Sequence, residues 1–555
     1  MKNIKYIFVS FLVAVLLTSC DEDKWLEEKA YDFYTPENSY TTTEQIDLAI
    51  THLYRNVSNM MYGSGANGDS FLFSYTTDVG YCTISINHEL NSWANAITPE
   101  SRHVGWLWTN YYKQIYDANT VLDRIENIEY ISEDKKNAKI AEAKFFRAYA
   151  YKCLAVIFGG VPIVLHEVNT VKRDFTRATE AEVWAQVIND LTDAAEFLPN
   201  ADEVEQDGRI AKGPAYHLLA EAYIVTKDYP KAIAAASEVI DNLGYSLMKE
   251  RFGTRSGEPG DVYWDLFRRG NQNRSSGNTE AIWVSQYEYL TPGGGPNDNL
   301  ARFLVTQYMN LKGNDNVSLF IGPTTQHGGR GIGWWAASDY MLNQVWQNDT
   351  NDIRNSQYNI MRDMIADNPS SAYYGQKIVE SGSFSNFLDP LKRSWSAIFV
   401  KSTPINNFPV EAITDPVTGL VNTGSNHSYR DRYVIRLAET YLLRAEAYLL
   451  NDDPTNALID LNTLRERSSA DPISVADVTM DFILDERARE LFVEENRLFT
   501  LMRMDKIVER VKAYNPMHNG VMSDNAINDY QNKWPIPSNE IERNTEATLE
   551  QNPGY

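Results

Sequence analysis

Residues 213–243 read GPAYHLLAEAYIVTKDYPKAIAAASEVIDNL, and apolar residues recur along them at the three- and four-residue spacing of an α-helix. Small side chains, at Ala220, Ala222 and Ala232, allow two helices to approach closely, and the ring of Tyr223 can fill the groove between them. We therefore predict a pair of antiparallel helices that pack through a face of small residues.

The same pattern recurs elsewhere in the chain. Residues 445–448 read AEAY, and Asp453 and Ala457 follow them at the same spacing as Asp228 and Ala232 follow the first copy. Residues 147–151, RAYAY, form a degenerate third copy. Three copies far apart predict a tetratricopeptide-like scaffold interrupted by insertions, whereas the alternative is chance similarity among alanine-rich helices.

Three more blocks have helical spacing, at residues 106–128, 136–158 and 182–198. Helix-breaking residues follow two of these blocks. Gly159, Gly160 and Pro162 come after the second block, and Pro199 comes after the third. The sequence therefore predicts a fold class dominated by α-helices.

Residues 251–426 have a different character. They include LTPGGGPNDN at 290–299 and GPTTQHGGRGIGWW at 322–335, with only short helical or strand-like pieces between such stretches. Loops on a rigid scaffold commonly carry binding residues. We expect a loop-rich ligand-binding part with a few short strands here.

Residues 482–507, FILDERARELFVEENRLFTLMRMDKI, have the pattern of one amphipathic helix. Asp485 and Arg489 are spaced to form a supporting i,i+4 pair. Glu495 falls on the apolar face, and if buried it requires a cationic or hydrogen-bonding partner.

The N-terminus reads MKNIKYIFVSFLVAVLLTSC, in which Lys2 and Lys5 precede a mostly apolar stretch at residues 7–17. That stretch is shorter than the ~20 apolar residues that a membrane-spanning helix needs, so we interpret residues 1–20 as a cleaved signal peptide. The end of this segment, LTSC, resembles the lipobox of bacterial lipoproteins, which implies that Cys20 is acylated and anchors the protein in lipid. The acidic residues 21–23 resemble a surface-export signal of Bacteroidota, and a solvated linker is the alternative.

The composition excludes one class of partner. The chain has 555 residues, with 75 Asp and Glu against 51 Lys and Arg, which gives a formal net charge of −24. Such a charge repels the phosphate backbone, so we expect no nucleic-acid partner. Besides Cys20 the chain has only Cys82 and Cys153, too few for a disulfide framework, and we expect both to be free thiols.

Several motifs together resemble the SusD/RagB family of nutrient-binding surface lipoproteins in Bacteroidota. They are EAKFFRAYAY with FGGVPIV (142–164), GRIAKGPAYHLLAEAYI (208–224), YVIRLAETYLLRAEAYL (433–449), ILDERAREL (483–491) and the closing PIPSNEI…QNPGY. The resemblance implies a SusD-like fold with four tetratricopeptide-like helix pairs and a loop-rich binding part. It also implies an outer-membrane location facing the exterior, and a partner transporter, the TonB-dependent barrel of the SusC type. We divide the mature chain into an N-terminal helical region, 21–250, and a C-terminal region, 251–555.

Ligand residues have to be argued from chemistry, because the quoted motifs lie in the scaffold. Sugar binders combine flat aromatic rings with polar side chains. Trp334 and Trp335 follow a glycine-rich loop, and adjacent side chains on a strand cannot both face one core, so we expect at least one exposed ring. Arg330 beside them can donate to hydroxyls or carboxylates, and a structural ion pair is its alternative.

Two further positions carry rings among polar residues. Trp93 is flanked by Asn91 and Asn95, a mixture that suits a sugar, although the tryptophan can equally pin a loop to the scaffold. Tyr287 and Tyr289 alternate as on a strand, so that Tyr287 can meet ligand, and core packing is the alternative.

No H-E-x-x-H, G-x-S-x-G or phosphate-cradling glycine loop occurs in the sequence, and we expect neither enzymatic activity nor a cofactor, while a structural metal stays open. The leading hypothesis is a glycan-binding protein that passes an oligosaccharide to the transporter. The alternatives are peptide binding within the same family, a glycoside hydrolase, whose carboxylates spacing alone cannot reveal, and an adaptor that binds only protein.

Overall fold

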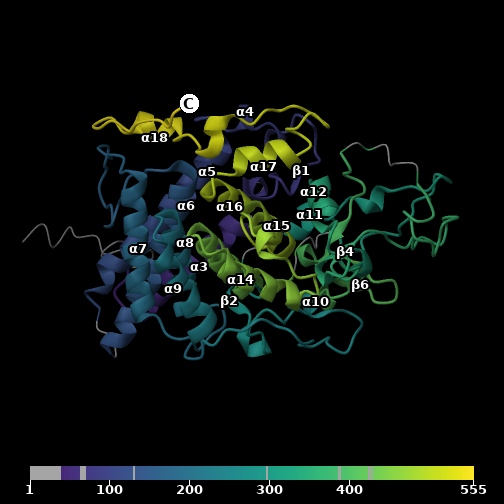
Figure 1. Cartoon of the computed structure of the whole chain (residues 1–555), viewed down its shortest axis with the longest axis horizontal. Coiled ribbons are helices and arrows are strands. Elements are labelled where there is room, and N and C mark those ends of the chain that lie inside the picture. The colour runs from purple at the N-terminus through teal and green to yellow at the C-terminus, as the bar shows by residue number, and fades with distance from the viewer. Residues whose placement is uncertain are drawn as a thin grey trace, which may run out of the picture.

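The computed structural model describes residues 39–62, 70–128, 132–295, 298–384, 389, 391–422, 427 and 429–555. Cys20 and the acidic residues 21–23 lie outside these ranges. Helices α6, α7, α8 and α9 stand at one end of the molecule and α11, α12, β4 and β6 at the other (Figure 1). The predicted α-rich class with a loop-rich part is thus confirmed.

The longer helices are α3 (Thr43–Tyr62), α5 (Arg102–Ile125), α6 (Glu133–Phe158), α7 (Glu180–Phe197), α8 (Lys212–Val225), α9 (Tyr229–Ser237), α13 (Leu437–Leu450), α14 (Pro454–Arg467), α15 (Met480–Leu491), α16 (Arg497–Arg503) and α17 (Ile507–Tyr514). Shorter ones are α4 (Trp93–Ala96), α10 (Val262–Leu266), α11 (Leu300–Leu304), α12 (Asp339–Leu342) and α18 (Ser538–Arg543). None of the described helices is both long and apolar enough to cross a membrane.

The helix pairs α8–α9 and α13–α14 use the same turn. Lys227 and Asp452 adopt positive φ angles of 62° and 56°, and the residue after each caps the next helix. The Asp228 side chain accepts from the Lys231 amide, and Asp453 accepts likewise at the start of α14. The equivalent alanines of the two pairs, Ala232 and Ala457, are fully buried, so the predicted helix pairs form as the small residues require.

The strands form four antiparallel pairs among the described residues. These are β1 (Gly80–Cys82) with β3 (Trp335–Ala337), β2 (Ala281–Ser285) with β8 (Arg432–Arg436), β4 (Ile360–Met361) with β5 (Ile398–Phe399), and β6 (Ile413–Asp415) with β7 (Leu420–Val421). In the β2–β8 pair, Ala281 lies opposite Arg436 and Ser285 opposite Arg432. This short ladder joins the loop-rich part to helix α13, which begins directly after β8.

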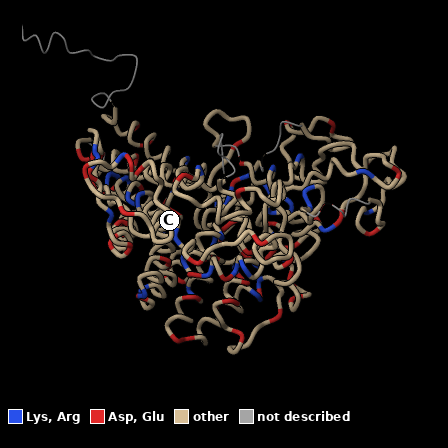
Figure 2. The backbone as a smooth tube through the Cα atoms, turned by 90° about the horizontal axis from the view of Figure 1, so that it is seen from above, with Lys and Arg blue, Asp and Glu red and all other residues tan. Residues whose placement is uncertain are grey.

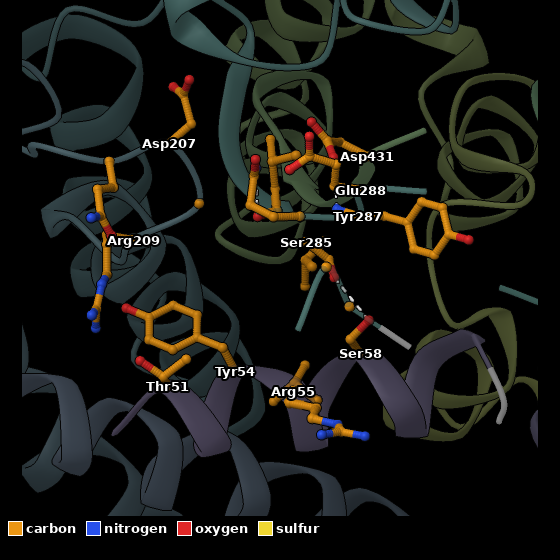
Figure 3. Close-up of a pocket in the computed structure, with 18 of the residues that line it drawn as sticks. Thr51, Tyr54, Arg55, Ser58, Asp207, Arg209, Ser285, Tyr287, Glu288 and Asp431 are labelled. Atoms are coloured by element: carbon orange, nitrogen blue, oxygen red, sulfur yellow. Dashed lines mark hydrogen bonds between the residues drawn. The ribbon is translucent and has the colours of Figure 1, made fainter. Parts of the chain in front are cut away.

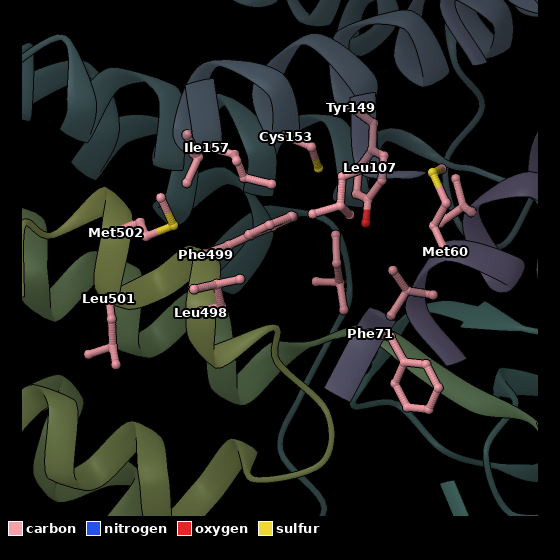
Figure 4. Packing of buried hydrophobic residues seen from close by; sticks show 14 of the residues in the cluster. Met60, Phe71, Leu107, Tyr149, Cys153, Ile157, Leu498, Phe499, Leu501 and Met502 are labelled. Carbon is pink, nitrogen blue, oxygen red and sulfur yellow. The ribbon is translucent and has the colours of Figure 1, made fainter. Parts of the chain in front are cut away.

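The hydrophobic core is centred on α6. Helices α5, α7 and α16 pack against it, and in Figure 4 Phe499 and Leu498 of α16 face Cys153 and Ile157 of α6. Cys153 is a fully buried free thiol, as predicted, and Cys82 is also fully buried. One continuous apolar cluster includes residues on both sides of position 250, and the proposed boundary there stays a prediction.

The prediction of a single helix over 482–507 was wrong. The chain leaves the helix after Leu491, and Val493 adopts a φ of +69° before α16 begins. The break lets two consecutive carboxylates reach different partners, because Glu494 lies 2.6 Å from Lys401 and Glu495 lies 2.6 Å from Arg487. The cationic partner expected for Glu495 is therefore present.

The predicted pair between Asp485 and Arg489 does not form. Asp485 instead lies 2.8 Å from Arg510, and Arg489 lies 2.8 Å from Glu486. Each side chain has another partner within reach, because the buried Arg489 pairs with Glu486 and Asp485 pairs with Arg510 of α17.

A buried ion-pair network surrounds α15. Figure 2 shows acidic and basic residues close together in the middle of the molecule. The network contains six carboxylates, Glu280, Asp349, Asp352, Glu486, Glu490 and Glu494, and six cations, Arg354, Lys401, Arg436, Arg465, Arg467 and Arg489. The charges balance, which is the condition under which buried ions are tolerated.

Candidate ligand-binding site

A cavity of about 760 Å³ opens between helix α3 and the segment that follows strand β2. In Figure 3, Thr51, Tyr54, Arg55 and Ser58 lie along α3, with Asp207 and Arg209 on a neighbouring loop. The far side is formed by residues 285–288, 293–295 and 431. The volume falls in the range that holds small-molecule and oligosaccharide ligands.

The α3 wall is fixed by hydrogen bonds to other elements. The Tyr54 hydroxyl donates to the Glu142 carboxylate of α6 at 2.7 Å and accepts from the Ile210 amide at 2.9 Å. Arg209 lies 3.0 Å from the same carboxylate, and its guanidinium stands 5.4 Å from the Tyr54 ring centroid. Burial, together with the negative charge of Glu142, holds the pKa of Tyr54 well above its usual value, so the ring stays neutral.

The opposite wall carries carboxylates. Asp431 accepts from the Tyr287 amide at 2.8 Å and from the Asn273 side chain at 2.7 Å. Burial raises the pKa of the Asp431 carboxyl, and the carboxylates of Asp207 and Glu288 act in the same direction. This wall therefore presents a concentration of hydrogen-bond acceptors.

The two walls meet at close contacts. Ser285 donates to Ser58 at 2.9 Å, which ties the end of β2 to α3. Gly208, at a φ of +84°, lies so close to Gln286 that an added Cβ would stand 2.6 Å from the Gln286 Cγ atom. Hydroxyls, amides and carboxylates thus converge on the space, an arrangement that suits a ligand rich in hydroxyl groups.

Of the predicted ligand residues, only Tyr287 lines this cavity. Figure 3 shows its ring directed away from α3. The ring packs instead against a small cluster that includes Phe408 and Tyr429, and burial raises the pKa of Tyr287 to about 12. Its backbone contributes to the cavity, and its ring follows the core-packing alternative.

Trp93 has no exposed surface and packs edge-on against Phe73 and Trp534. This burial leaves no ring face for a sugar, so we do not retain Trp93 as a ligand contact. The sequence pattern misled because the neighbouring amides serve the fold: Asn91 donates to the Cys82 carbonyl at 2.7 Å, and the exposed Asn95 donates to Ser92 at 2.8 Å.

The two adjacent tryptophans divide as expected for neighbours on a strand. Trp335 is 2% exposed, and its indole N–H donates to the Tyr75 carbonyl at 2.8 Å, which excludes it as a stacking surface. Trp334 is partly exposed and lies nearly parallel to the Phe303 ring at 4.7 Å between centroids. Arg330 is also partly exposed and forms no ion pair with any described residue. Trp334 and Arg330 therefore remain candidates on a second surface.

The α3 residues, Asp207 and Asp431 cannot be identified from the sequence, because no spacing rule connects segments so far apart. One weak signal was available. Gly208 and Arg209 open the GRIAKG motif, and both line the cavity. Within the described ranges, no group of three His, Cys, Asp or Glu side chains is placed to hold a metal ion.

Comparisons with known proteins cover nearly the whole chain. The profile of the SusD family matches residues 268–555, just over half of the chain, and a second profile, described as starch-binding associating with outer membrane, matches residues 24–224. SusD-like protein P2 of Formosa agariphila is 26% identical over the full length of both proteins. The starch-binding protein SusD of Bacteroides thetaiotaomicron is 25% identical, covering 82% of this chain and 80% of its own length.

Solved structures have the same fold. A laminarin-binding SusD-like protein superimposes with a TM-score of 0.66 at 21% identity, covering 93% of this chain and all of its own. A surface glycan-binding protein A from Bacteroides thetaiotaomicron, in complex with laminarihexaose, gives a TM-score of 0.67 at 18% identity, with 92% of this chain and all of the other covered. From the helix pairs, the loop-rich part and the two matching profiles, we conclude that the chain belongs to the SusD family.

Proposed function

We propose that this protein captures an oligosaccharide at the outer surface of the outer membrane, without cleaving it, and delivers it to a SusC-like TonB-dependent transporter. The observation that carries the proposal is the cavity between α3 and residues 285–288, whose walls present hydroxyls, amides and carboxylates. Family membership supports it, because two relatives of the same fold are described as binding laminarin or laminarihexaose. The acylated Cys20 is proposed to tether the protein to the membrane.

Carboxylates and side-chain amides bind sugars by accepting hydrogen bonds from hydroxyls. Glu288 is exposed on the cavity wall and has no side-chain hydrogen bond with the described residues, so its oxygens are available to a ligand. A charge-assisted hydrogen bond contributes about 1.5–3 kcal/mol. Glu288→Gln should therefore weaken glycan binding about tenfold or more while leaving the fold unchanged.

Isothermal titration calorimetry of the purified protein against a panel of neutral glycans tests this proposal. Glu380→Gln is the matched control and should leave the affinity unchanged. Glu380 is an exposed carboxylate in the loop-rich part, and among the described residues its only ion pair is with Lys377. If peptides bind and no glycan does, the result would favour the alternative that this protein captures peptides. Product analysis of the same mixtures tests hydrolysis, because any shortened glycan would contradict a purely binding role.

The partly exposed surface at Trp334 and Arg330 is the competing location. Trp334→Ala removes the ring and leaves the cavity intact. A loss of glycan affinity in Trp334→Ala, with none in Glu288→Gln, would place the ligand on that surface and reject the cavity while keeping the proposed function.

A further inference from the structure

Arg268, two residues after the end of helix α10 (Figure 1), carries a buried guanidinium group without a carboxylate partner among the described residues. Its side chain is 2% exposed. The Nη1 atom donates to the Ile405 carbonyl at 2.9 Å, but the buried Nε and Nη2 atoms have no acceptor. The buried Arg354 and Arg436, by contrast, each contact three carboxylates.

Two carboxylates whose charges act on Arg268, those of Asp265 and Glu258, already have other partners. Asp265 accepts from Arg251 at 3.0 Å, and Glu258 lies 2.7 Å from Arg255. Burial lowers the pKa of Arg268 to about 10, and the positive charge of Arg255 adds to this effect. The surroundings therefore leave a positive charge uncompensated.

The Arg268 atoms without acceptors show from which side a ligand could bind. Nε and Nη2 lie on one edge of the guanidinium, the edge that grips a carboxylate or sulfate with two parallel hydrogen bonds. The Trp264 ring covers a face of the group at 4.0 Å and leaves the edge free. A ligand that binds in the plane of the guanidinium contacts its edge and needs neither face of the group.

A second unsatisfied donor belongs to the same loop that accepts from Arg268. Asn407 follows Ile405 by two residues, and its Oδ1 atom accepts from Arg255 at 3.3 Å, while its buried Nδ2 atom has no acceptor. Asn406 beside it is exposed, so this loop reaches the protein surface. Arg268 thus has two buried N–H donor atoms without acceptors, and Asn407 in the loop that it contacts has a third.

We propose that the Arg268–Asn407 loop binds an oxyanion, a carboxylate or a sulfate, at the free Nε–Nη2 edge. A buried charge is destabilising unless a counter-charge accompanies it, and a water molecule would supply acceptors without charge. An oxyanion supplies both. The source is either a free inorganic anion or the acidic substituent of a glycan, and this site is separate from the cavity of the proposed function.

Crystals soaked in selenate, a sulfate analogue whose selenium scatters anomalously, provide the direct test. We expect a selenium peak within hydrogen-bond distance of Arg268 Nε and Nη2. Calorimetry with glucuronate, using glucose as the neutral comparison, distinguishes the sources: heat from glucuronate alone assigns an acidic sugar, and selenate binding without glucuronate binding assigns an inorganic anion. Absence of both signals would overturn the proposal.

A designed counter-charge gives an independent test in solution. Asn407→Asp places a carboxylate where the unsatisfied amide stands, so it should remove the selenate peak and raise the melting temperature in anion-poor buffer. Asn406→Asp adds the same charge on an exposed side chain and is the control. Adding sulfate should raise the melting temperature of the wild type and the control by about 2 °C more than that of Asn407→Asp. Equal sulfate dependence in all three proteins would contradict the site.

Discussion

Replacing Glu486 by glutamine tests the buried ion-pair network. The Glu486 side chain is fully buried, and it accepts from Arg354 at 2.7 Å, Arg465 at 3.1 Å and Arg489 at 2.8 Å. Burial by itself would raise the pKa of this carboxyl, but the three guanidinium groups outweigh burial and lower it from 4.5 to about 2. At 1.36 kcal/mol for each pKa unit, the ionised carboxylate contributes about 3 kcal/mol to stability at pH 7.

Glutamine keeps the shape and removes the charge, so Glu486→Gln should lose about 3 kcal/mol in the free energy of unfolding at pH 7. The folded-state pKa lies below the unfolded one, so this contribution is complete above pH 4.5 and is lost as the pH falls toward 2. Urea unfolding at pH 7 and at pH 3.5 should therefore show a smaller gap between wild type and variant at the lower pH. Equal stability at pH 7, or a gap that does not narrow, would refute the assignment of this energy to ionised Glu486.

Other substitutions test separate parts of the molecule. Cys20→Ala should move the protein from the membrane to the soluble fraction while leaving glycan affinity unchanged, as cell fractionation and calorimetry would show. Trp93→Ala should cost about 3–5 kcal/mol in thermal melts, because the ring is fully buried, without a specific effect on ligand affinity. Gly160→Ala should destabilise by about 1–3 kcal/mol, since its Cβ would lie 2.1 Å from the Ala178 carbonyl oxygen, whereas Gly105→Ala, in open helical space, should not.

The helix pairs could be predicted because their determinants are local. A buried alanine such as Ala232 or Ala457 and the tyrosine nine residues before it lie within two adjacent helices, so helical spacing alone places them together. The same holds for Cys153, which lies within a block of helical spacing and is fully buried. Periodicity reports which face of an element is apolar, and here the apolar face and the buried face coincide.

The site could not be predicted in the same way because its parts are joined by tertiary contacts. Asp431 reaches the cavity only through the pairing of β8 with β2, and Tyr54 is positioned by Glu142, 88 residues away. The polar neighbours of Trp93 also favoured contact with a sugar, but its ring is fully buried. A tryptophan among asparagines has the same local pattern whether the amides bind a sugar or the backbone.

The buried network and the cavity are connected through the β2–β8 ladder. Glu280 immediately precedes β2 and pairs with Arg436 at the end of β8, so the network closes one end of the ladder. At the other end, Ser285 pairs with Arg432, and the chain continues into the cavity residues Glu288 and Asp431. A slip of one residue would turn the side chains of the slipped strand to the other face of the pair, separating Glu280 from Arg436 and breaking a buried ion pair of the network. The cost of that state specifies the register, and the register places the carboxylate wall opposite α3. The charged residues within ILDERAREL, which periodicity presents only as the polar face of a helix, therefore help to position a binding site that they do not touch.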